Sequence, residues 1–198
     1  MEWLIKEELK TTVGDAFYNG WHNRTTFGYH SYNIDNINIE GQRNPKMRLN
    51  RMRKYISFKN KKVLDLGCNV GAMLHHLFEI KEGLGYDFDH NCINAGNNIS
   101  KILGRKNINL FTHDFDSSQL SFKEFKPDII FILSLGSWIK SWKELYQSCL
   151  DTGAIIILET NNDKEGKEQL EFFKDYKLII SESKDDTTGN KGRKTYLI

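Results

Sequence analysis

The sequence predicts a doubly wound α/β fold, with a seven-stranded, mostly parallel sheet and helices on both of its faces. Two patterns predict this fold. From residue 62 onward, short apolar runs alternate with longer amphipathic stretches, which is typical of repeated strand and helix units. The runs are apolar at nearly every position, as at 129–133, which is typical of parallel strands buried on both faces. A length of 198 residues allows one such domain and a small extension.

The expected elements of this domain follow one another without long gaps. Buried strands are expected at 63–66, 83–86, 107–111, 129–133 and 154–158. Helices are expected at 72–79, 90–103, 142–150 and 166–173. Asp89 is the expected N-cap of the second of these helices. Two further strands, at 176–180 and 194–198, are joined by a glycine-containing turn, so we expect this last pair to be antiparallel.

The first 60 residues are expected to form an extension or lid in front of the domain at 61–198. Apolar residues alternate on both sides of Asp35 and Asn36, which predicts a small hairpin. Asn44 and Pro45 are typical of a helix start, and this helix is expected to run to about Tyr55. The stretch 17–32 is rich in aromatic and polar side chains, and we expect it to fold over the substrate site.

The net charge of +2 conceals a strongly basic segment. Residues 41–64 contain no acid and nine Lys or Arg residues, so +2 overall and +9 here leave −7 elsewhere. Such a segment indicates either an anionic ligand or a solvated helix face. The sequence alone leaves both interpretations open.

Composition excludes several classes of protein. An aromatic content of 12% with only two prolines excludes collagen-like and wholly disordered chains. No apolar run approaches 18 residues, and the acidic start lacks the pattern of a signal peptide, so we expect a cytoplasmic protein without membrane contact. Three widely separated cysteines indicate reduced thiols. No metal-binding motif is present, and no metal is expected.

A glycine-rich loop is the strongest functional motif. It reads DLGCNVG at 65–71 and lies directly after a predicted strand and before a predicted helix. Gly67 and Gly71 let the backbone turn tightly and approach a ligand closely. Asn69 stands where a third glycine would be expected, and asparagine tolerates left-handed backbone. The spacing differs from the G-x-G-x-x-G pattern of nicotinamide dehydrogenases, which disfavours that class.

Polar side chains also follow the other predicted strands. Asp87 ends the second strand, 22 residues after Asp65, where an acid can accept both hydroxyls of a ribose. Asp114 and Phe115 follow the third strand and could contact the exocyclic amine and the ring of adenine. Ser134 follows the fourth strand. Because ligands of open α/β sheets bind outside the carboxyl ends of the strands, these residues are expected to face one cleft.

Together these motifs resemble the class I S-adenosylmethionine-dependent methyltransferases. The resemblance covers roughly 62–198 and rests on VLDLGCNVG at 63–71, GYDFD at 85–89, HDF at 113–115, PDIIFILS at 127–134 and GAIIILE at 153–159. It implies a Rossmann-like methyltransferase fold with a reversed last strand, and S-adenosyl-L-methionine as cofactor. GQRNP at 41–45 and ILSLGSWIK at 132–140 are similar to the Bin3-type methyltransferases, which methylate RNA 5′ phosphates. The segment 160–175 is shorter than in that branch.

The resemblance implies cofactor contacts for the motif residues. Those assigned to the cofactor are Asp65, Gly67, Cys68, Asn69, Gly71, Asp87, Phe88, Asp114, Phe115 and Ser134. Arg43, in GQRNP, would bind the carboxylate of the cofactor through its bidentate guanidinium. Two alternatives for Arg43 stay open: it could bind an anionic acceptor, or be a surface charge at a helix start.

The acceptor is less closely defined. Candidate acceptor-binding residues are Tyr29, Arg48 and Trp138, and His30 is the candidate general base for a hydroxyl acceptor, with a purely structural histidine as the alternative. The basic segment favours O-methylation of a small or glycan-linked acceptor that carries phosphate or sugar groups. An RNA methyltransferase, acting on a 5′ phosphate or on tRNA, is one alternative. A non-catalytic subunit that binds S-adenosylmethionine is another.

Overall fold

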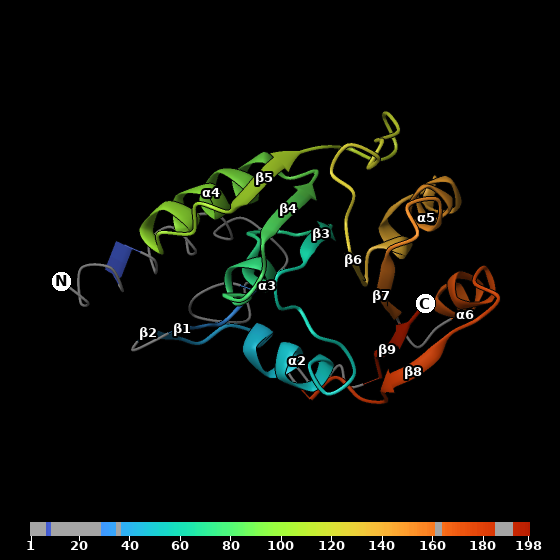
Figure 1. Cartoon of the computed structure of the whole chain (residues 1–198), viewed down its shortest axis with the longest axis horizontal. Helices are drawn as coiled ribbons and strands as arrows, with labels where there is room; N and C mark the ends of the chain where they lie inside the picture. Colours follow the sequence, from blue (N-terminus) through green and yellow to red (C-terminus); the bar gives the residue numbers. More distant parts are fainter. Residues whose placement is uncertain (1–6, 9–28, 35–36, 161–163, 185–191) are drawn as a thin grey trace.

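The computed structural model describes residues 7–8, 29–34, 37–160, 164–184 and 192–198. Its centre is a seven-stranded sheet with the strand order β5-β4-β3-β6-β7-β9-β8 (Figure 1). In chain order the strands are β3 (Lys62–Leu66), β4 (Glu82–Asp87), β5 (Ile108–Thr112), β6 (Ile129–Leu133), β7 (Ile155–Thr160), β8 (Lys177–Ile180) and β9 (Lys194–Leu197).

Six of these strands run in the same direction, and the last, β9, is reversed. β3 pairs with both β4 and β6, and the parallel pairing continues outward to β5 and β7. β9 is antiparallel to both β7 and β8, which confirms the predicted reversed strand. The chain builds β3, β4 and β5 in one direction and then returns to place β6 on the other side of β3. The sheet therefore has its topological switch point between β3 and β6, where open α/β sheets bind ligands.

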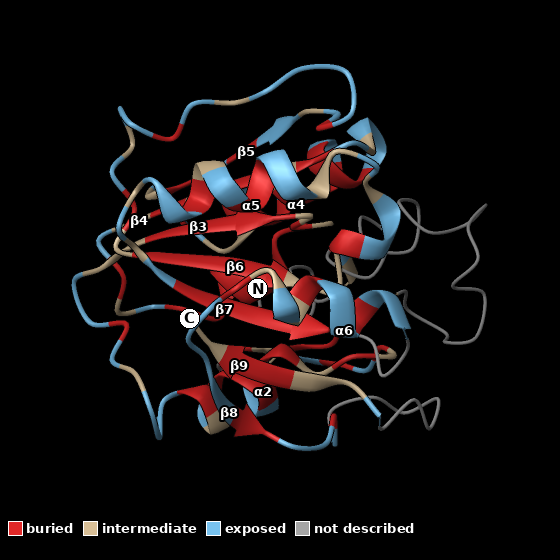
Figure 2. Ribbon diagram, turned by 90° about the vertical axis from the view of Figure 1, so that its right-hand side faces the viewer, coloured by how far each residue is buried: buried red, intermediate tan, exposed pale blue. Residues whose placement is uncertain are grey.

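Helices cover both faces of the sheet, as predicted. One face carries α2 (Pro45–Met52), α3 (Ala72–His75) and α4 (His90–Ile102), and the other carries α5 (Trp142–Leu150) and α6 (Lys164–Glu171). Adjacent residues of β3 show the division, because Val63 packs in the core layer of α2 and Leu64 in that of α5. In Figure 2 the central strands are buried, whereas α4, α5 and α6 turn one side to solvent.

Most element boundaries lie within two residues of the prediction, and α2 and α3 are the exceptions. The prediction that α3 runs to residue 79 is wrong, because the helix ends at His75. The guanidinium of Arg105 donates to the carbonyl oxygens of His75 and Leu77, and so satisfies backbone acceptors at and just beyond the end of the helix. α2 ends at Met52 rather than near Tyr55, because its last turn tightens and Tyr55 N donates to the carbonyl of Met52.

A hairpin from the N-terminal extension packs against α3. Its strands, β1 (Tyr32–Ile34) and β2 (Ile37–Ile39), are antiparallel, which confirms the predicted hairpin, although the turn residues between them lie outside the described residues. The hydroxyl of Tyr32, a fully buried side chain, lies 3.0 Å from Nδ1 of His75. Asn33 N donates to Nε2 of His76 at 3.2 Å. Most of the aromatic stretch 17–32 lies outside the described residues.

Candidate active site

The glycine-rich loop connects β3 to α3 at the carboxyl edge of the sheet. Three of its residues have left-handed backbone: Gly67 with φ of 72°, Asn69 with φ of 54° and Gly71 with φ of 71°. A Cβ atom on Gly67 would lie 2.6 Å from Cδ1 of Leu135, in the loop that follows β6. The motif therefore needs its glycines both for the backbone turn and for close packing against the neighbouring loop.

Asp87, at the end of β4, stabilises this loop. One of its carboxylate oxygens accepts from Asn69 N at 2.8 Å, and the other accepts from Asp89 N at 3.0 Å. Asp89 caps α4, as predicted, by accepting from Asn91 N. The side-chain oxygen of Asn69 is buried and has no hydrogen-bond partner among the described residues. An unpartnered buried acceptor beside a carboxylate is suited to a ligand that donates hydrogen bonds, as a ribose or an ammonium group does.

Asp65 lies beneath the loop as a buried carboxyl group. Its side chain is 2% exposed. Burial raises the pKa of Asp65 to about 8, the charge of Arg48 opposes this shift, and the charge of Asp87 adds to it. A bound cation would stabilise the ionised form of Asp65. The two acids and the left-handed loop therefore fit a cofactor with an ammonium group, a sulfonium and a ribose.

The other predicted cofactor residues differ in exposure. Cys68 is buried, and burial raises the pKa of its thiol well above the usual range, so it stays protonated. Phe88 is 76% exposed beside Asp87. Asp114 is exposed at the end of β5, where its carboxylate accepts from Asp116 N. Phe115 is buried in the core layer of α5, with its ring 5.1 Å from that of His113.

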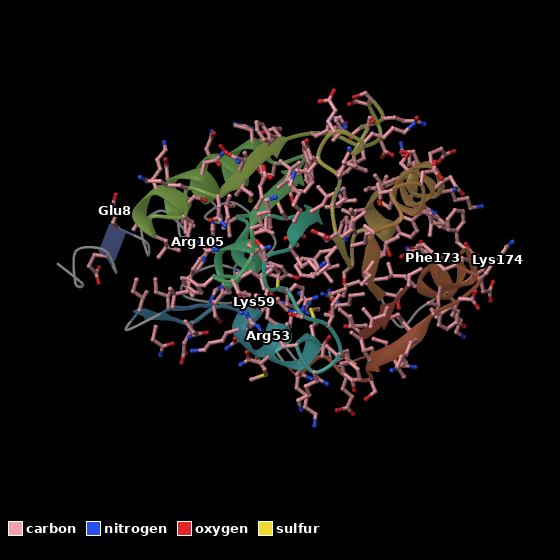
Figure 3. All side chains as sticks on the ribbon, in the orientation of Figure 1. Glu8, Arg53, Lys59, Arg105, Phe173 and Lys174 are labelled. Atoms are coloured by element: carbon pink, nitrogen blue, oxygen red, sulfur yellow. The ribbon has the colours of Figure 1, made fainter. Side chains whose placement is uncertain are left out.

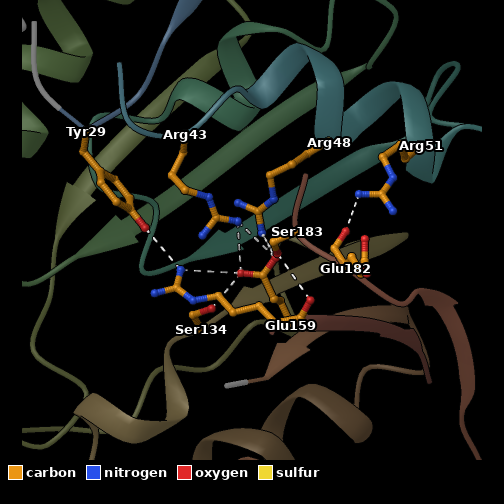
Figure 4. Close-up of polar contacts among 9 residues, drawn as sticks. Tyr29, Arg43, Arg48, Arg51, Ser134, Glu159, Glu182 and Ser183 are labelled. Atoms are coloured by element: carbon orange, nitrogen blue, oxygen red, sulfur yellow. Dashed lines mark hydrogen bonds and ion pairs between the residues drawn. The ribbon is translucent and has the colours of Figure 1, made fainter. Parts of the chain in front are cut away.

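A second cluster of polar side chains surrounds Glu159 at the carboxyl end of β7 (Figure 4). Nη2 of Arg43 lies 3.3 and 3.2 Å from the two carboxylate oxygens. Nη2 of Arg48 donates to Oε2 at 2.6 Å, and the hydroxyl of Ser134 donates to Oε1 at 2.7 Å. Nη1 of Arg193 lies 3.8 Å from Oε1. We call these five residues the Glu159 cluster.

The Glu159 cluster keeps its carboxylate ionised. The side chain of Glu159 is 1% exposed. Burial alone would raise the pKa of Glu159, but the guanidinium groups of Arg48 and Arg43, with the Ser134 hydroxyl, lower it to about 2. Ser134 has a left-handed backbone, with φ of 60°, and its N also donates to the carbonyl of Glu159. A non-glycine residue in this conformation is often found at functional sites.

The Glu159 cluster adjoins the glycine-rich loop. Arg48 lies close enough to Asp65 to oppose the rise in the pKa of that group, and it also pairs with Glu159. His30 lies between the two groups, because the charges of Arg48 and Arg43 lower the pKa of its ring and a contact with the side chain of Asn69 raises it. The residues at the ends of β3 and β7 therefore form one continuous polar site, with the basic N-terminal segment across it.

His30 is 6% exposed, and Nδ1 of its ring has no hydrogen-bond partner among the described residues. Burial, with the charges of Arg48 and Arg43, holds the pKa of His30 well below its usual value. Its imidazole is therefore neutral near pH 7. A neutral ring with an unpartnered nitrogen can accept a proton or donate a hydrogen bond, depending on its tautomer.

Tyr29 and Trp138 lie at two sides of this edge. The hydroxyl of Tyr29 lies 3.5 Å from Nη1 of Arg193. Trp138 ends the short helix η1 (Gly136–Trp138), which follows Ser134, and is 65% exposed. The structure therefore brings Tyr29, Arg48 and Ser134 together around Glu159, whereas Trp138 stays on the surface.

Most of the basic segment is used in ion pairs. Besides Arg43 and Arg48, Arg53 pairs with Glu79, Lys61 with Asp128 and Lys62 with Glu82. Arg51 donates to the carbonyl of Glu182. Arg53 and Lys59 lie beside α2, far from Phe173 and Lys174 near α6 (Figure 3). The basic segment thus pairs with acids from several other elements, and only its first arginines reach the site.

Two residues of the Glu159 cluster, Glu159 and Arg193, are not among the site residues predicted from the sequence. Glu159 ends the apolar run of β7, and an acid that closes a fully buried strand is a signal that could have identified it. Arg193 lies just before β9 in a polar stretch, and its position gave no such signal. Only the antiparallel pairing of β9 with β7 brings Arg193 to this edge of the sheet.

Comparison with known proteins defines the class. The sequence pattern of the methyltransferase domain family matches residues 38–179. Comparison with curated protein sequences gave no match. The chain belongs to the methyltransferase domain family, and it is an S-adenosylmethionine-dependent methyltransferase with a Rossmann-like fold. This confirms the class, the enzyme activity and the cofactor that the sequence predicted.

Solved structures show the same fold at low sequence identity. The N-terminal domain of EvdMO1 with S-adenosylhomocysteine bound is 13% identical, with a TM-score of 0.67, over 100% of this chain and 96% of that one. This chain covers 47% of the longer EvdMO1 chain. A SAM-dependent methyltransferase from Aquifex aeolicus is 14% identical, with a TM-score of 0.59, over 79% of this chain and 89% of that one.

A third similar structure is a complex between the Haloferax volcanii Trm112 methyltransferase activator and a methyltransferase. It is 11% identical, with a TM-score of 0.59, over 77% of this chain and 88% of that one. Within the described part of this chain, no helix is long and apolar enough to cross a membrane.

Proposed function

We propose that this methyltransferase transfers a methyl group to an oxygen of a small or glycan-linked acceptor that carries negative charge, such as a sugar phosphate. One observation carries the proposal: three arginines converge on Glu159 at the carboxyl end of β7, beside the cofactor loop. Guanidinium groups bind phosphate and carboxylate through paired hydrogen bonds. Arginines at this place would hold an anionic acceptor next to the methyl donor.

We propose that the cofactor lies along the carboxyl edge of the sheet. S-adenosylmethionine supplies an electrophilic methyl group on a sulfonium, and the protein aligns the acceptor with it. The residues assigned to the methionine part are Asp65, Gly67, Asn69 and Gly71. Asp87 is assigned to the ribose and Asp114 with Phe115 to the adenine, and the further cofactor contacts are Cys68, Phe88 and Ser134. The unpartnered oxygen of Asn69 and the buried carboxyl of Asp65 support this placement.

Arg43 keeps two roles within this proposal, as a contact of the cofactor carboxylate or of the acceptor. The side chain is 1% exposed and directed at Glu159, which supports a role inside the site and not as a surface charge. Residues 1–60 would form the acceptor side of the site, because Tyr29, His30, Arg43 and Arg48 all come from this segment. Trp138, on the exposed rim, would contact the bound acceptor.

His30 would act as the general base for a hydroxyl acceptor. Its imidazole is neutral, buried and adjacent to the cofactor loop, and Nδ1 has no partner among the described residues. The lowered pKa leaves the ring unprotonated near pH 7, so it can accept the proton that leaves the hydroxyl, and it also makes this imidazole a weaker base than an ordinary histidine. A phosphate oxygen as acceptor would need no base, so activity of a His30→Gln variant would separate these two kinds of acceptor.

The decisive experiment uses labelled cofactor. Calorimetric titration with S-adenosylmethionine should show binding to the wild type and much weaker binding to Asp87→Ala; no binding to either protein, or equal binding to both, would contradict the proposed site. Incubation with labelled S-adenosylmethionine and a fractionated lysate should then label the small-molecule or glycan fraction. Label in RNA would support the RNA methyltransferase alternative. Cofactor binding without any labelled product would support a non-catalytic subunit.

A further inference from the structure

Arg193 has an incompletely satisfied guanidinium in a buried place. Its side chain is only 16% exposed. Nη1 makes two long contacts, 3.8 Å to Oε1 of Glu159 and 3.5 Å to the hydroxyl of Tyr29. Nε is buried and has no hydrogen-bond partner among the described residues. The guanidinium therefore lies near Glu159 with its Nε–H unused.

A buried guanidinium donor without an acceptor is energetically costly. Buried polar groups are normally hydrogen-bonded, and an unsatisfied charged donor loses its water without replacement. The cluster offers Arg193 little compensation, because both oxygens of Glu159 already accept shorter bonds from Arg43, Arg48 and Ser134. A ligand oxygen would supply the missing acceptor.

The fold explains why Arg193 reaches this position. β9 runs antiparallel to β7, with Thr195 opposite Glu159 and Lys194 opposite Thr160. Arg193, one residue before β9, therefore lies at the carboxyl end of β7. The cofactor loop follows β3, which is separated from β7 by β6 alone. Arg193 thus lies at the ligand-binding edge on one side of the cofactor loop, and Asp87, which ends β4, lies on the other side. An acceptor would bind on the side of Arg193.

We propose that Arg193 binds an oxyanion of the methyl acceptor, a phosphate or a carboxylate. This proposal rests on the proposed function, which requires an anionic acceptor. Nε–H and the neighbouring Nη2–H form the planar edge that binds an oxyanion through two parallel hydrogen bonds. The Tyr29 hydroxyl, beside Nη1, would orient the guanidinium from the other side.

The test measures binding of simple anions to the protein loaded with S-adenosylhomocysteine. Inorganic phosphate and acetate are titrated in separate arms, which distinguishes the two oxyanions. A charge-assisted hydrogen bond contributes enough to predict that Arg193→Gln weakens anion binding by about 10-fold or more. Arg193→Lys keeps the charge but lacks the planar edge, so an intermediate loss is expected.

The control is Arg53→Gln, which removes an arginine from another ion pair, with Glu79. We expect this variant to bind both anions as the wild type does. S-adenosylhomocysteine affinity is measured for every variant, so that a folding defect is separated from loss of the anion site. If Arg193→Gln does not bind S-adenosylhomocysteine, two other measurements test the anion site. These are anion binding by Arg193→Lys and the shift of an Arg Nε–H resonance of the wild type when an anion is added.

Two results would overturn the proposal. One is a wild type that binds S-adenosylhomocysteine but shows no phosphate or acetate binding and no shift of an Arg Nε–H resonance. The other is equal anion binding by the wild type and the Arg193 variants. Failure of the proposed function looks different, because then methyl transfer goes to a neutral acceptor or to none, whatever the anion titration shows.

Discussion

Glu159 illustrates how one buried residue organises several distant segments. It comes from the end of β7, yet it contacts Arg43 and Arg48 from the N-terminal segment and Ser134 from the loop after β6. The geometry is favourable, because the pairs are short and the carboxylate is almost wholly enclosed. Removing one partner of such a buried group leaves the others with uncompensated charge.

We therefore expect Glu159→Gln to be strongly destabilising. Loss of the carboxylate should lower the free energy of unfolding by about 3–5 kcal/mol, as for other broken buried ion pairs. Denaturant titration of the two proteins measures this difference. The matched control is Glu79→Gln, which removes the partner of Arg53, a side chain that is 30% exposed, and should cost about 1 kcal/mol or less. Similar losses in both variants would contradict a special role for Glu159.

Asp65 should couple cofactor binding to proton release. Burial raises its pKa to about 8, so the carboxyl group is mostly protonated at pH 7 when no ligand is bound. The positive charges of S-adenosylmethionine favour the ionised form, so binding should lower this pKa and release a fraction of a proton. Calorimetry in buffers with different ionisation enthalpies measures the release. Asp65→Asn should abolish that contribution, and an unchanged proton release in this variant would rule it out.

At the scale of elements, the strands provide the frame and the loops at their carboxyl ends provide the chemistry. The five parallel strands were predicted within two residues because their apolar runs can only be buried strands. The helices next to the site were predicted less well. α3 ends early, and Arg105, thirty residues after its last residue, donates to the carbonyl groups of His75 and Leu77; no local pattern indicates such a contact.

The glycine-rich loop gives a prediction with an internal control. Gly67→Ala should destabilise the protein and weaken S-adenosylhomocysteine binding, because φ is 72° and the new Cβ would meet Leu135 at 2.6 Å. Gly153→Ala imposes the same left-handed strain, with φ of 70°, but its Cβ would meet nothing within 4 Å. Left-handed backbone costs about 1–2 kcal/mol in a non-glycine residue. Both variants should lose stability, whereas a loss of ligand affinity in Gly153→Ala would argue against a local effect.

The contact between β1 and α3 should be sensitive to acid. His76 accepts from Asn33 N through Nε2, and burial lowers its pKa from 6.5 to about 4. The contribution of neutral His76 to stability is complete above pH 6.5 and is lost as the pH falls toward 4, because the unfolded chain binds the proton first. The unfolding free energy should therefore fall more steeply between pH 6.5 and 4.5 in the wild type than in His76→Gln.

A matched variant and the chosen pH window isolate this effect. His90→Gln, on an exposed helix start, should keep the slope of the wild type. Glu159, with a pKa of about 2, loses its contribution only below pH 4.5. Asp65 acts in the opposite direction, since its raised pKa favours the folded state as the pH falls from 8, but it does so equally in all three proteins. Equal slopes in the wild type and His76→Gln would exclude His76 as the acid-sensitive group.

At the scale of the whole molecule, folding pairs most of the basic residues of the segment 41–64 with acids from elsewhere in the chain. The basic segment 41–64 forms ion pairs with acids on the loop after α3, on β4 and β7, and before β6. Lys46, Lys54 and Lys59 have no ion pair with a described residue. The segment is therefore a structural feature that also delivers two arginines to the site, and not a continuous basic surface.

This charge distribution predicts weak dependence of any RNA binding on salt. With about three available cations from the segment, the logarithm of the binding constant should fall against the logarithm of salt concentration with a slope of roughly −2 for single strands. Titration of a labelled oligonucleotide at several salt concentrations measures it. A much steeper slope would indicate a broad phosphate-binding surface and favour the RNA methyltransferase alternative.

The sequence by itself determined the fold class and the loop at 65–71, because these depend on local patterns, and the resemblance of its motifs to a known family implied the cofactor. Apolar runs define buried strands, and the motif is contiguous in the chain. The individual site residues stay predictions. What only the tertiary structure decided is the Glu159 cluster, since residues 43, 48, 134, 159 and 193 are separated by up to 150 positions. The reversal of β9 was predicted, but their meeting also depends on the strand order, which places β6, β7 and β9 side by side and which no local pattern encodes.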